Sequence, residues 1–426
     1  MQQHYDAIIV GAGPAGSAAA IRLAQAGWSV AIVEREEFPR RKVCGECVAA
    51  SNLPLLEAMG VGEMFSDIAG PELRRVAVLW GRERISAPLP AAINAPHPWG
   101  RALGRALLDT LLLERARALG VTVWQPYMAH RLNGSPGAYC CELRRMYATG
   151  VARLESASSV TLSAPLAIAA NGSCQTLPAD RATAGTSAGA GARANDLLAF
   201  KANFTGAQLE AGLLPVLAFA GGYGGMVLAE GSVMTLACCI QLAALQRARR
   251  MTPGLRAGEV VQAYLREHCA GVAEALSGAQ RSGEWLAVGP IRPGVAAAAA
   301  AAPGSGLPPF RIGNAAGEAH PLVGEGISMA LQSAWLLTAM LIERPELRGR
   351  GSAALDAQRA VHVRYARQWR RQFMGRMRLA AGLAQLAMRP RAARSLLPLL
   401  RRAPGLLTQG ARWSGKIRSV QARTRP

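Results

Sequence analysis

The first candidate for chemistry is a glycine-rich hexapeptide, Gly11-Ala12-Gly13-Pro14-Ala15-Gly16, which follows an apolar run and opens a helical pattern. Gly11 permits a tight turn, Gly13 has no side chain to keep a phosphate from the helix, and Gly16 lets helix and strand pack closely. The N-terminus of such a helix offers unpaired N–H groups and about half a positive charge to a phosphate. Glu34, at the end of the next strand, would accept hydrogen bonds from the hydroxyls of an adenosine ribose. The pattern therefore predicts a dinucleotide site formed by Gly11, Gly13, Pro14, Ala15, Gly16 and Glu34.

Two later segments favour FAD over a nicotinamide dinucleotide alone. Arg105 lies in a helical pattern, where it is placed to meet a cofactor phosphate. A second glycine-rich segment, residues 313–327, ends a short strand and leads into another helix; it reads Gly-Asn-Ala-Ala-Gly-Glu-Ala-His-Pro-Leu-Val-Gly-Glu-Gly-Ile. This segment resembles the second FAD fingerprint of the flavoprotein superfamily that includes aromatic-ring hydroxylases, geranylgeranyl reductases and flavin-dependent halogenases. Within it, the chain is most similar to the geranylgeranyl-reductase-like, FAD-dependent oxidoreductases associated with type III polyketide pathways.

The resemblance extends over nearly the whole chain, including the loop from Arg35 to Cys47, and it implies where FAD is held. In the family, an Asp after the first glycine of the second fingerprint binds the flavin's ribityl or ribose hydroxyls; this chain has Asn314, which can form a hydrogen bond but carries no charge. The loop that follows runs beside the isoalloxazine, and the N-terminus of its helix would stabilise negative charge on reduced flavin. Asn171-Gly172 replaces the family's Asp-Gly, whose Asp contributes to FAD and NADPH handling in the hydroxylases. The expected cofactor contacts thus also include Arg35, Arg105, Gly313, Asn314, Pro321, Gly324, Glu325, Gly326 and Ile327.

The segment from Arg41 to Cys47 resembles the family's loop over the flavin ring, so Cys44 or Glu46 could contact flavin or substrate. Two plainer alternatives are that Cys44 fills space against the ring and that Glu46 is a surface or helix-capping acid. Cys44 and Cys47 also form a C-x-x-C pair, for which a redox-active disulfide is an alternative, because nearby Lys42 would lower a thiol pKa. The pair lacks the partner ligands of a zinc site, so no metal is predicted.

His320 and Tyr223 complete the catalytic candidates. His320 precedes Pro321, which holds it out of helix geometry, and it could donate a proton near neutral pH or simply brace the loop. Tyr223 lies where the reductases carry an aromatic motif that faces the substrate cavity, although neither their Tyr-x-Trp-x-Phe-Pro run nor the halogenase Trp-x-Trp-x-Ile-Pro pattern is present. Lys201 could bind an anionic group or point outward from its strand. The expected apolar cavity wall consists of Phe200, Phe204, Leu217, Phe219, Met226 and Leu228.

The elements that must position these residues alternate between strands and helices, with a mainly antiparallel stretch inserted between them. This order predicts an α/β fold: a Rossmann-type, glutathione-reductase-like FAD/NAD(P)-binding domain, an inserted, mainly antiparallel β-sheet substrate domain and a C-terminal helical segment. A meander is expected between residues 138 and 162, a flexible loop at 183–193, and a low-complexity alanine run at 296–302. The expected domains are residues 1–73, 100–175 and 281–345 for FAD, residues 74–99 and 176–280 for substrate, and residues 346–426 for the basic helical region.

The net charge of +21 is concentrated at the C-terminal end of the 426-residue chain, because residues 360–426 contain 16 Arg or Lys and no Asp or Glu. This region is expected to be either a solvated helix face or a surface for anionic membrane lipid, since apolar residues lie between its arginines. No nucleic-acid reader motif is present, so nucleic acid is not an expected partner. No apolar stretch reaches the ~18–20 residues of a membrane helix, and no signal peptide precedes the first strand. We therefore expect a cytoplasmic protein with reduced thiols, peripheral to a membrane at most, whose oligomeric state stays open.

The leading functional hypothesis is an FAD monooxygenase that uses NAD(P)H as a transient electron donor to hydroxylate a hydrophobic aromatic or polyketide-type substrate. The chain has one strand-led G-x-G-x-x-G, so NAD(P)H would dock without a domain of its own, or another protein would supply the electrons. The alternatives are a flavin-dependent reductase that saturates C=C bonds of a prenyl or polyketide chain, and a non-catalytic flavin-binding partner protein.

Overall fold

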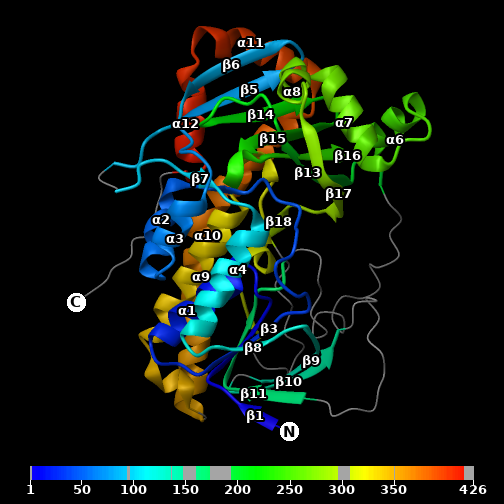
Figure 1. Ribbon diagram of the computed structural model, residues 1–426. Coiled ribbons are helices and arrows are strands. Elements are labelled where there is room, and N and C mark those ends of the chain that lie inside the picture. The colour runs from blue at the N-terminus through cyan, green and yellow to red at the C-terminus, as the bar shows by residue number, and fades with distance from the viewer. Residues whose placement is uncertain are drawn as a thin grey trace.

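The computed structural model describes residues 2–93, 96–135, 137–146, 160–172, 193–295, 308–349 and 351–416. The loop expected at 183–193 (Arg193 apart), the alanine run at 296–302 and the middle of the expected meander lie outside these ranges. Two regions follow one another along the long axis of the molecule: a layered α/β region below, and a large sheet with its own helices above (Figure 1). This architecture confirms the predicted α/β fold class.

A five-stranded parallel sheet forms the middle layer of the lower region. From one edge to the other, its strands are β19 (Phe310–Arg311), β12 (Leu166–Ala169), β2 (Ala7–Val10), β3 (Val30–Val33) and β8 (Thr122–Trp124). The central strands are apolar throughout and fully buried, as is typical of parallel strands covered on both faces. One cover is a four-stranded sheet of β1 (Gln2–His4), β11 (Val160–Ala164), β10 (Ala138–Arg145) and β9 (Tyr127–Ser135).

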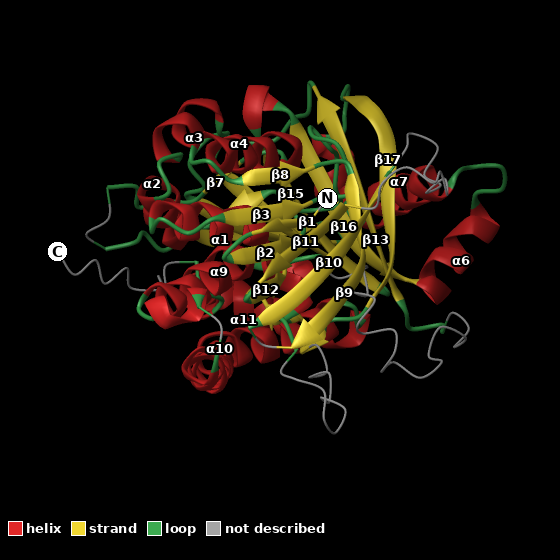
Figure 2. Ribbon diagram, turned by 90° about the horizontal axis from the view of Figure 1, so that it is seen from below, coloured by secondary structure: helices red, strands yellow, loops and turns green. Residues whose placement is uncertain are grey.

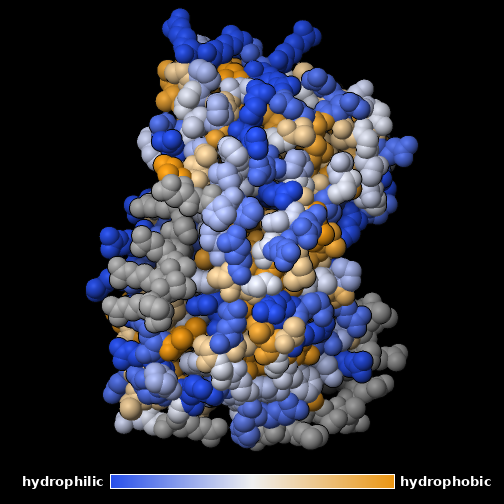
Figure 3. Space-filling model, turned by 60° about the vertical axis from the view of Figure 1, so that its left-hand side comes forward, coloured by the Kyte–Doolittle hydropathy of each residue, from blue (hydrophilic) through white to orange (hydrophobic). Residues whose placement is uncertain are grey.

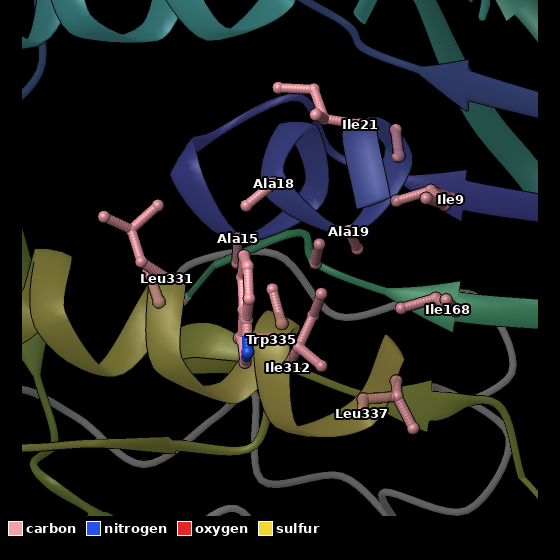
Figure 4. Packing of buried hydrophobic residues seen from close by; sticks show 14 of the residues in the cluster. Ile9, Ala15, Ala18, Ala19, Ile21, Ile168, Ile312, Leu331, Trp335 and Leu337 are labelled. Atoms are coloured by element: carbon pink, nitrogen blue, oxygen red, sulfur yellow. The ribbon is translucent and has the colours of Figure 1, made fainter. Parts of the chain in front are cut away.

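The other face of the parallel sheet is covered by helices that bring the two glycine-rich turns together. These helices are α1 (Pro14–Gln25), α4 (Arg105–Ala118) and α9 (Gly326–Ile342). Small side chains on α1, including Ala15 and Ala18, let α9 approach closely through Leu331 and Trp335 (Figure 4). Because α1 and α9 each begin at a glycine-rich turn, their contact places both turns at the same edge of the sheet.

Short elements connect the two regions. Two-stranded ladders join β4 (Cys47–Val48) to β7 (Arg101–Ala102) and β18 (Gly294–Val295) to β20 (Gly317–Glu318). Two small α-helices, α2 (Leu53–Ala58) and α3 (Gly62–Ile68), follow the first ladder strand. The 3-10 turns are η1 (Ala50–Asn52), η3 (Glu230–Ser232), η4 (Gly313–Ala315), η5 (Pro321–Val323) and η6 (Pro345–Arg348).

The upper region is built on a seven-stranded, mainly antiparallel sheet. From edge to edge, its strands are β17 (Gln280–Ile291), β13 (Leu197–Thr205), β16 (Met234–Gln241), β15 (Gly222–Leu228), β14 (Leu213–Phe219), β5 (Arg75–Trp80) and β6 (Glu83–Pro88). Its outer face is covered by α6 (Leu242–Met251), α7 (Ala257–His268) and α8 (Ala270–Ala275). Because β17 pairs with β13, residues 281–291 are hydrogen-bonded into this sheet, whereas we expected them in the FAD-binding domain. The expected domain bounds otherwise stay a prediction.

The residues expected to line a substrate cavity lie on the outer face of this sheet, under the helices. They share one core cluster with Val260 and Val261 of α7: Phe200, Phe204, Leu217, Phe219 and Met226, with Leu228 packed against it. The predicted cavity wall therefore lies on the wrong face of the sheet. Alternate residues of a strand point to opposite faces, and the bulkier apolar residues of these strands point into the core. The inner face, toward the glycine-rich turns, carries Leu197, Ala199, Tyr223, Cys239 and Ile291 instead.

The C-terminal helices are part of the folded body. They are α10 (Ser352–Ala387), α11 (Pro390–Arg402) and α12 (Gly405–Trp413), and α10 lies on the outer side of α9 (Figure 2). Side chains at helical spacing, including Tyr365, Trp369 and Phe373, bury one stripe of α10 and leave its arginine-rich face exposed. No helix in the described ranges combines the length and the apolar character needed to cross a membrane.

Candidate FAD-binding and catalytic site

Two glycines of the first turn are required by the packing of the backbone. Gly11 has a φ of +102°, and a Cβ on it would lie 2.5 Å from the carbonyl oxygen of Ala170. A Cβ on Gly16 would lie 1.8 Å from the carbonyl oxygen of Gly11. Gly13 differs, because it is extended (φ −68°, ψ −178°) and its Cβ would meet no described atom closer than 3.7 Å. The space beside Gly13, at the N-terminus of α1, is therefore open to a ligand.

Two arginines border this open position. The nearest atoms to a Cβ on Gly13 are Nη2 of Arg105, at 3.7 Å, and Nη2 of Arg40, at 3.8 Å. Arg105 is buried and donates two hydrogen bonds to Asp109, at 2.6 and 2.7 Å. Burial alone would lower the pKa of Arg105, but the Asp109 carboxylate outweighs this effect and raises the pKa. Two fixed guanidinium groups beside a helix N-terminus form a site suited to a pyrophosphate.

Arg40 and Lys42 were not among the predicted cofactor contacts. Burial, and then the nearby charges of Arg105 and Arg40, lower the pKa of Lys42. The sequence signal for both residues was the basic run Arg40-Arg41-Lys42. This run lies in the loop that follows strand β3 and Glu34. Arg35 lies at the surface instead, with its Nη2 3.0 Å from Glu36 Oε1. The cofactor role expected for Arg35 stays a prediction.

The Glu34 carboxylate stabilises the first turn through hydrogen bonds. Its Oε2 accepts a hydrogen bond from the backbone N–H of Ala12 (2.9 Å), and its Oε1 accepts one from the N–H of Glu36 (3.0 Å). Arg40 Nη2 lies 3.7 Å from the same carboxylate. The carboxylate thus lies directly under the turn, where the predicted contact with an adenosine ribose stays a prediction.

The second turn packs directly onto the first. Gly313 has a φ of +58°, and a Cβ on it would lie 2.9 Å from the Cβ of Ala15. Its N–H donates to Ser333 Oγ (2.8 Å), and Nδ2 of the next residue, Asn314, lies 3.5 Å from Glu318 Oε1. The segment from Pro321 to Gly326, here called the closing loop, then leads into α9 through Gly324, whose φ is +63°. Ile327 is buried in the first turn of that helix.

The loop from Arg41 to Cys47, here called the first loop, is fixed by Glu46. The Glu46 carboxylate is buried and accepts hydrogen bonds from the backbone N–H of Arg105 (2.9 Å), from Lys201 Nζ and from Thr235 Oγ1. Lys201 is only 3% exposed, so the alternative that it points outward is wrong: its ammonium pairs with the Glu46 carboxylate inside the protein. The placement of Glu46 matches the helix-capping alternative, because its carboxylate binds the first N–H of α4.

Both thiols of the C-x-x-C pair are free. Cys44 Sγ accepts a hydrogen bond from the N–H of Glu46 (3.3 Å), and it also lies beside the guanidinium of Arg105. Burial raises the pKa of Cys47, although Lys416 opposes the effect. A thiol with a raised pKa is a poor nucleophile, so Cys47 is poorly suited to attack a disulfide. The redox role considered for the pair stays a hypothesis.

The structure brings Tyr223 and His320 together. Tyr223 OH lies 3.0 Å from His320 Nδ1, and Tyr223 also forms a hydrogen bond with the thiol of Cys239. Burial raises the pKa of Tyr223 far above its usual value and the pKa of Cys239 to about 12, so both groups stay protonated. Burial also lowers the pKa of His320. The Tyr223 hydroxyl thus lies between the Cys239 thiol and Nδ1 of His320, and the tautomer of the imidazole decides whether Tyr223 or His320 is the donor in their hydrogen bond.

Comparison with known proteins places the chain in a family. A family model described as FAD binding domain matches residues 4–370, and the chain belongs to this family. A menaquinone reductase of Mycobacterium tuberculosis is 32% identical over 115 residues, which are 27% of this chain and 27% of that protein. The chain thus spans about a quarter of the length of the first curated relatives it matches.

Solved structures share the fold across the chain. The myxobacterial chondrochloren halogenase has a TM-score of 0.69 at 19% identity, with 98% of this chain and 92% of that chain covered. A probable FAD-dependent monooxygenase from Pseudomonas aeruginosa has a TM-score of 0.64 at 15% identity, with 97% and 99% covered. The superfamily that the motifs indicated, with geranylgeranyl reductase-like and monooxygenase members, is confirmed.

Proposed function

We propose that this FAD-dependent oxidoreductase is a monooxygenase that hydroxylates a hydrophobic aromatic or polyketide-type substrate, with NAD(P)H as the electron donor. The observation that carries the proposal is the pair of buried Tyr223 and half-buried His320, with Tyr223 OH 3.0 Å from His320 Nδ1, at an apolar cluster on the inner face of the seven-stranded sheet. Val43 of the first loop and Leu322 of the closing loop pack against that cluster. Apolar side chains around a reacting centre exclude water from it and suit a hydrophobic substrate.

The residues at the two turns fit FAD. Arg40, Arg105 and the N-terminus of α1 would hold the pyrophosphate beside Gly13, and Glu34 would bind the adenosine ribose. Asn314 would bind a hydroxyl of the ribityl chain, and the closing loop would flank the ring. When bound, FAD supplies two-electron transfer and reaction with O₂.

His320 is the residue that we propose to move a proton. Tyr223 holds Nδ1, so Nε2 is the atom that exchanges a proton with substrate or solvent. Because burial lowers the pKa of His320, the ring is mostly neutral at physiological pH and becomes a stronger acid when it is protonated. Such a group can take up and return a proton within one turnover.

The test is stopped-flow spectroscopy of the FAD-loaded protein with NADH and with NADPH, in air and without it, using a panel of phenolic and polyketide-type aromatics. We expect NAD(P)H to bleach the flavin, and one aromatic to cause O₂ uptake with oxygen from labelled O₂ in the product. Product formation without O₂, or O₂ uptake that no aromatic changes, contradicts the monooxygenase.

A second candidate is a flavin-dependent C=C reductase. The observation that favours it is the 32% identity with a menaquinone reductase over the matched segment. In this reaction His320 would protonate one carbon while the adjacent carbon receives a hydride from reduced flavin. Anaerobic turnover of a prenyl or polyketide chain supports this candidate, whereas a stably bound flavin that reacts with neither NAD(P)H nor O₂ supports a non-catalytic partner protein.

We further propose that α11 and α12 contact anionic membrane lipid. The end of the molecule that carries α11 shows strongly hydrophilic side chains with apolar patches between them (Figure 3). Arg391, Arg394 and Arg402 are exposed on α11, and large exposed apolar side chains are Leu399 on α11 and Trp413 at the end of α12. Interleaved arginine and apolar side chains are typical of helices that lie in a lipid headgroup layer.

Replacing these three arginines by Gln is expected to reduce binding to phosphatidylglycerol vesicles, with about 1 kcal/mol lost for each charge near the surface. Sedimentation of the full-length protein with vesicles measures the effect, and phosphatidylcholine vesicles give the uncharged reference. The matched control replaces Arg247, Arg249 and Arg250, which are exposed on α6. Equal loss in both variants, or no binding by the parent protein, contradicts the contact.

A further inference from the structure

We propose that the C-terminal segment Ser414–Lys416, here called the clasp, is a positioning element of the flavin site, in which Lys416 ties together the two loops that flank the flavin ring and adjusts the charge beside it. The inference rests on FAD binding as proposed above. It concerns residues that lie outside both fingerprints and far beyond the second one in sequence, so no motif pointed to them.

The clasp is anchored beside the first loop. Ser414 and Gly415 are buried. Ser51 in η1 donates hydrogen bonds from its N–H to the carbonyl oxygen of Lys416 (3.2 Å) and from its Oγ to the carbonyl oxygen of Gly415 (3.1 Å). Because η1 follows Val48 almost directly, the clasp holds the end of the first loop.

The Lys416 ammonium touches both loops. Its Nζ lies 3.5 Å from the carbonyl oxygen of Gly324 in the closing loop and 3.7 Å from Cys47 Sγ in the first loop. A third contact is Glu325 Oε1, at 3.9 Å. One side chain therefore bridges the two segments that the family resemblance places around the ring.

Glu325 is a buried carboxylate whose charge needs these cations. Neither of its oxygens has a hydrogen bond among the described residues, and its side chain is 0% exposed. Arg376 Nη1 lies 3.5 Å away and Lys416 Nζ 3.9 Å away, so two cations face one carboxylate. Burial raises the pKa of Glu325, while Lys416 and Arg376 oppose the effect. Glu325 immediately precedes α9, so this cluster with one excess positive charge lies at the positive end of the helix dipole.

Arg376 is itself fixed by the clasp and by a buried polar network. It donates to Gln332 Oε1 (2.9 Å), and Gln332 Nε2 donates to Asn52 Oδ1 (3.2 Å). Gly415 has a φ of +96°, and a Cβ on it would lie 2.6 Å from Arg376 Cζ. The clasp thus requires glycine at this position for the arginine to lie against it.

The excess positive charge should stabilise reduced, anionic flavin more than oxidised flavin. Lys416→Met should therefore shift the flavin midpoint potential to a more negative value and weaken FAD binding about tenfold, which corresponds to the loss of about 1.4 kcal/mol. Glu325→Gln should shift the potential in the opposite direction, because it removes the only negative charge of the cluster. The potential of the double variant should return toward the parent value. Lys416→Arg keeps the positive charge, so its potential and FAD affinity should stay close to those of the parent protein.

Spectroelectrochemical titration of the FAD-loaded, full-length proteins measures the potentials, and flavin fluorescence measures FAD affinity. Arg412→Met is the matched control, because it removes an exposed positive charge from neighbouring α12 and should change neither quantity. Potentials that move in the same direction in both single variants, or that do not move, overturn the clasp while leaving FAD binding established. A parent protein that binds no FAD overturns the proposed function itself. If Lys416→Met does not fold, the Glu325→Gln and Lys416→Arg proteins still decide the question.

Discussion

Gly13→Glu is expected to abolish FAD binding and to leave the apo-protein folded. A side chain at position 13 has room, since its Cβ would be 3.7 Å from the nearest described atom and its backbone is extended. The added carboxylate would reach Arg105 and Arg40 and would occupy the place of the pyrophosphate at the N-terminus of α1. We expect FAD affinity to fall by at least about a thousandfold, or about 4 kcal/mol. Fluorescence titration with FAD measures the loss, and thermal unfolding of the apo-protein checks the fold.

Gly16→Ala is the matched control for this experiment. Its Cβ would lie 1.8 Å from the carbonyl oxygen of Gly11, so it should lower the stability of the apo-protein itself. We thus expect Gly13→Glu to lower FAD affinity without unfolding the apo-protein, and Gly16→Ala to lower the stability of the apo-protein. A Gly13→Glu protein that still takes up FAD tightly would place the pyrophosphate somewhere else.

His320→Gln is expected to reduce turnover about a hundredfold or more while FAD binding and flavin reduction by NAD(P)H stay close to normal. The parent rate should rise as the pH falls through the pKa of His320, which burial has moved below its usual value, because protonated His320 is the donor. The variant should lose this dependence. Tyr223→Phe removes the hydrogen bond at Nδ1 and should have a smaller effect, about tenfold, by freeing the ring to change tautomer.

Steady-state rates between pH 5 and pH 8 on the substrate identified by the stopped-flow screen measure both variants. His97→Gln serves as the control, because the side chain of His97 is 44% exposed and its Nε2 lies 3.2 Å from Glu57 Oε1. If turnover is unchanged in His320→Gln, the Tyr223–His320 pair has only a structural role in holding the closing loop. A pH profile shared by parent and variant would assign the proton to another group.

The parts of this fold that could be predicted are those with local signals. Each glycine-rich turn lies between a short buried strand and a helix, and this order alone predicts that Gly11–Gly16 and Gly313–Ile327 face the same edge of a parallel sheet. The α/β class follows from the same alternation. The first turn alone is compatible with FAD or NAD. The resemblance of residues 313–327 to the second FAD fingerprint of the superfamily indicates FAD.

The parts that could not be predicted depend on contacts between distant residues. Strand alternation divides Leu197–Thr205 into two faces but does not say which one meets α7, so the apolar wall was placed on the wrong face. Lys201 was interpreted as a possible surface residue because its buried partner, Glu46, is 155 residues away. Lys416 and Ser51 are related in the same way, and no pattern around either residue indicates the other.

The order in which the sheets are assembled has a consequence for synthesis of the protein. The edge strand β19, the second glycine-rich turn and α9 all lie beyond residue 309, and the seven-stranded sheet takes strands from residues 75–88, 197–241 and 280–291. A nascent chain that has emerged from the ribosome only to residue 270 lacks β17, β19 and the second turn. The edge of β13 that pairs with β17 and the side of α1 that packs on α9 then stay uncovered, so we expect the growing polypeptide to expose apolar surface during translation and to acquire flavin only near its end.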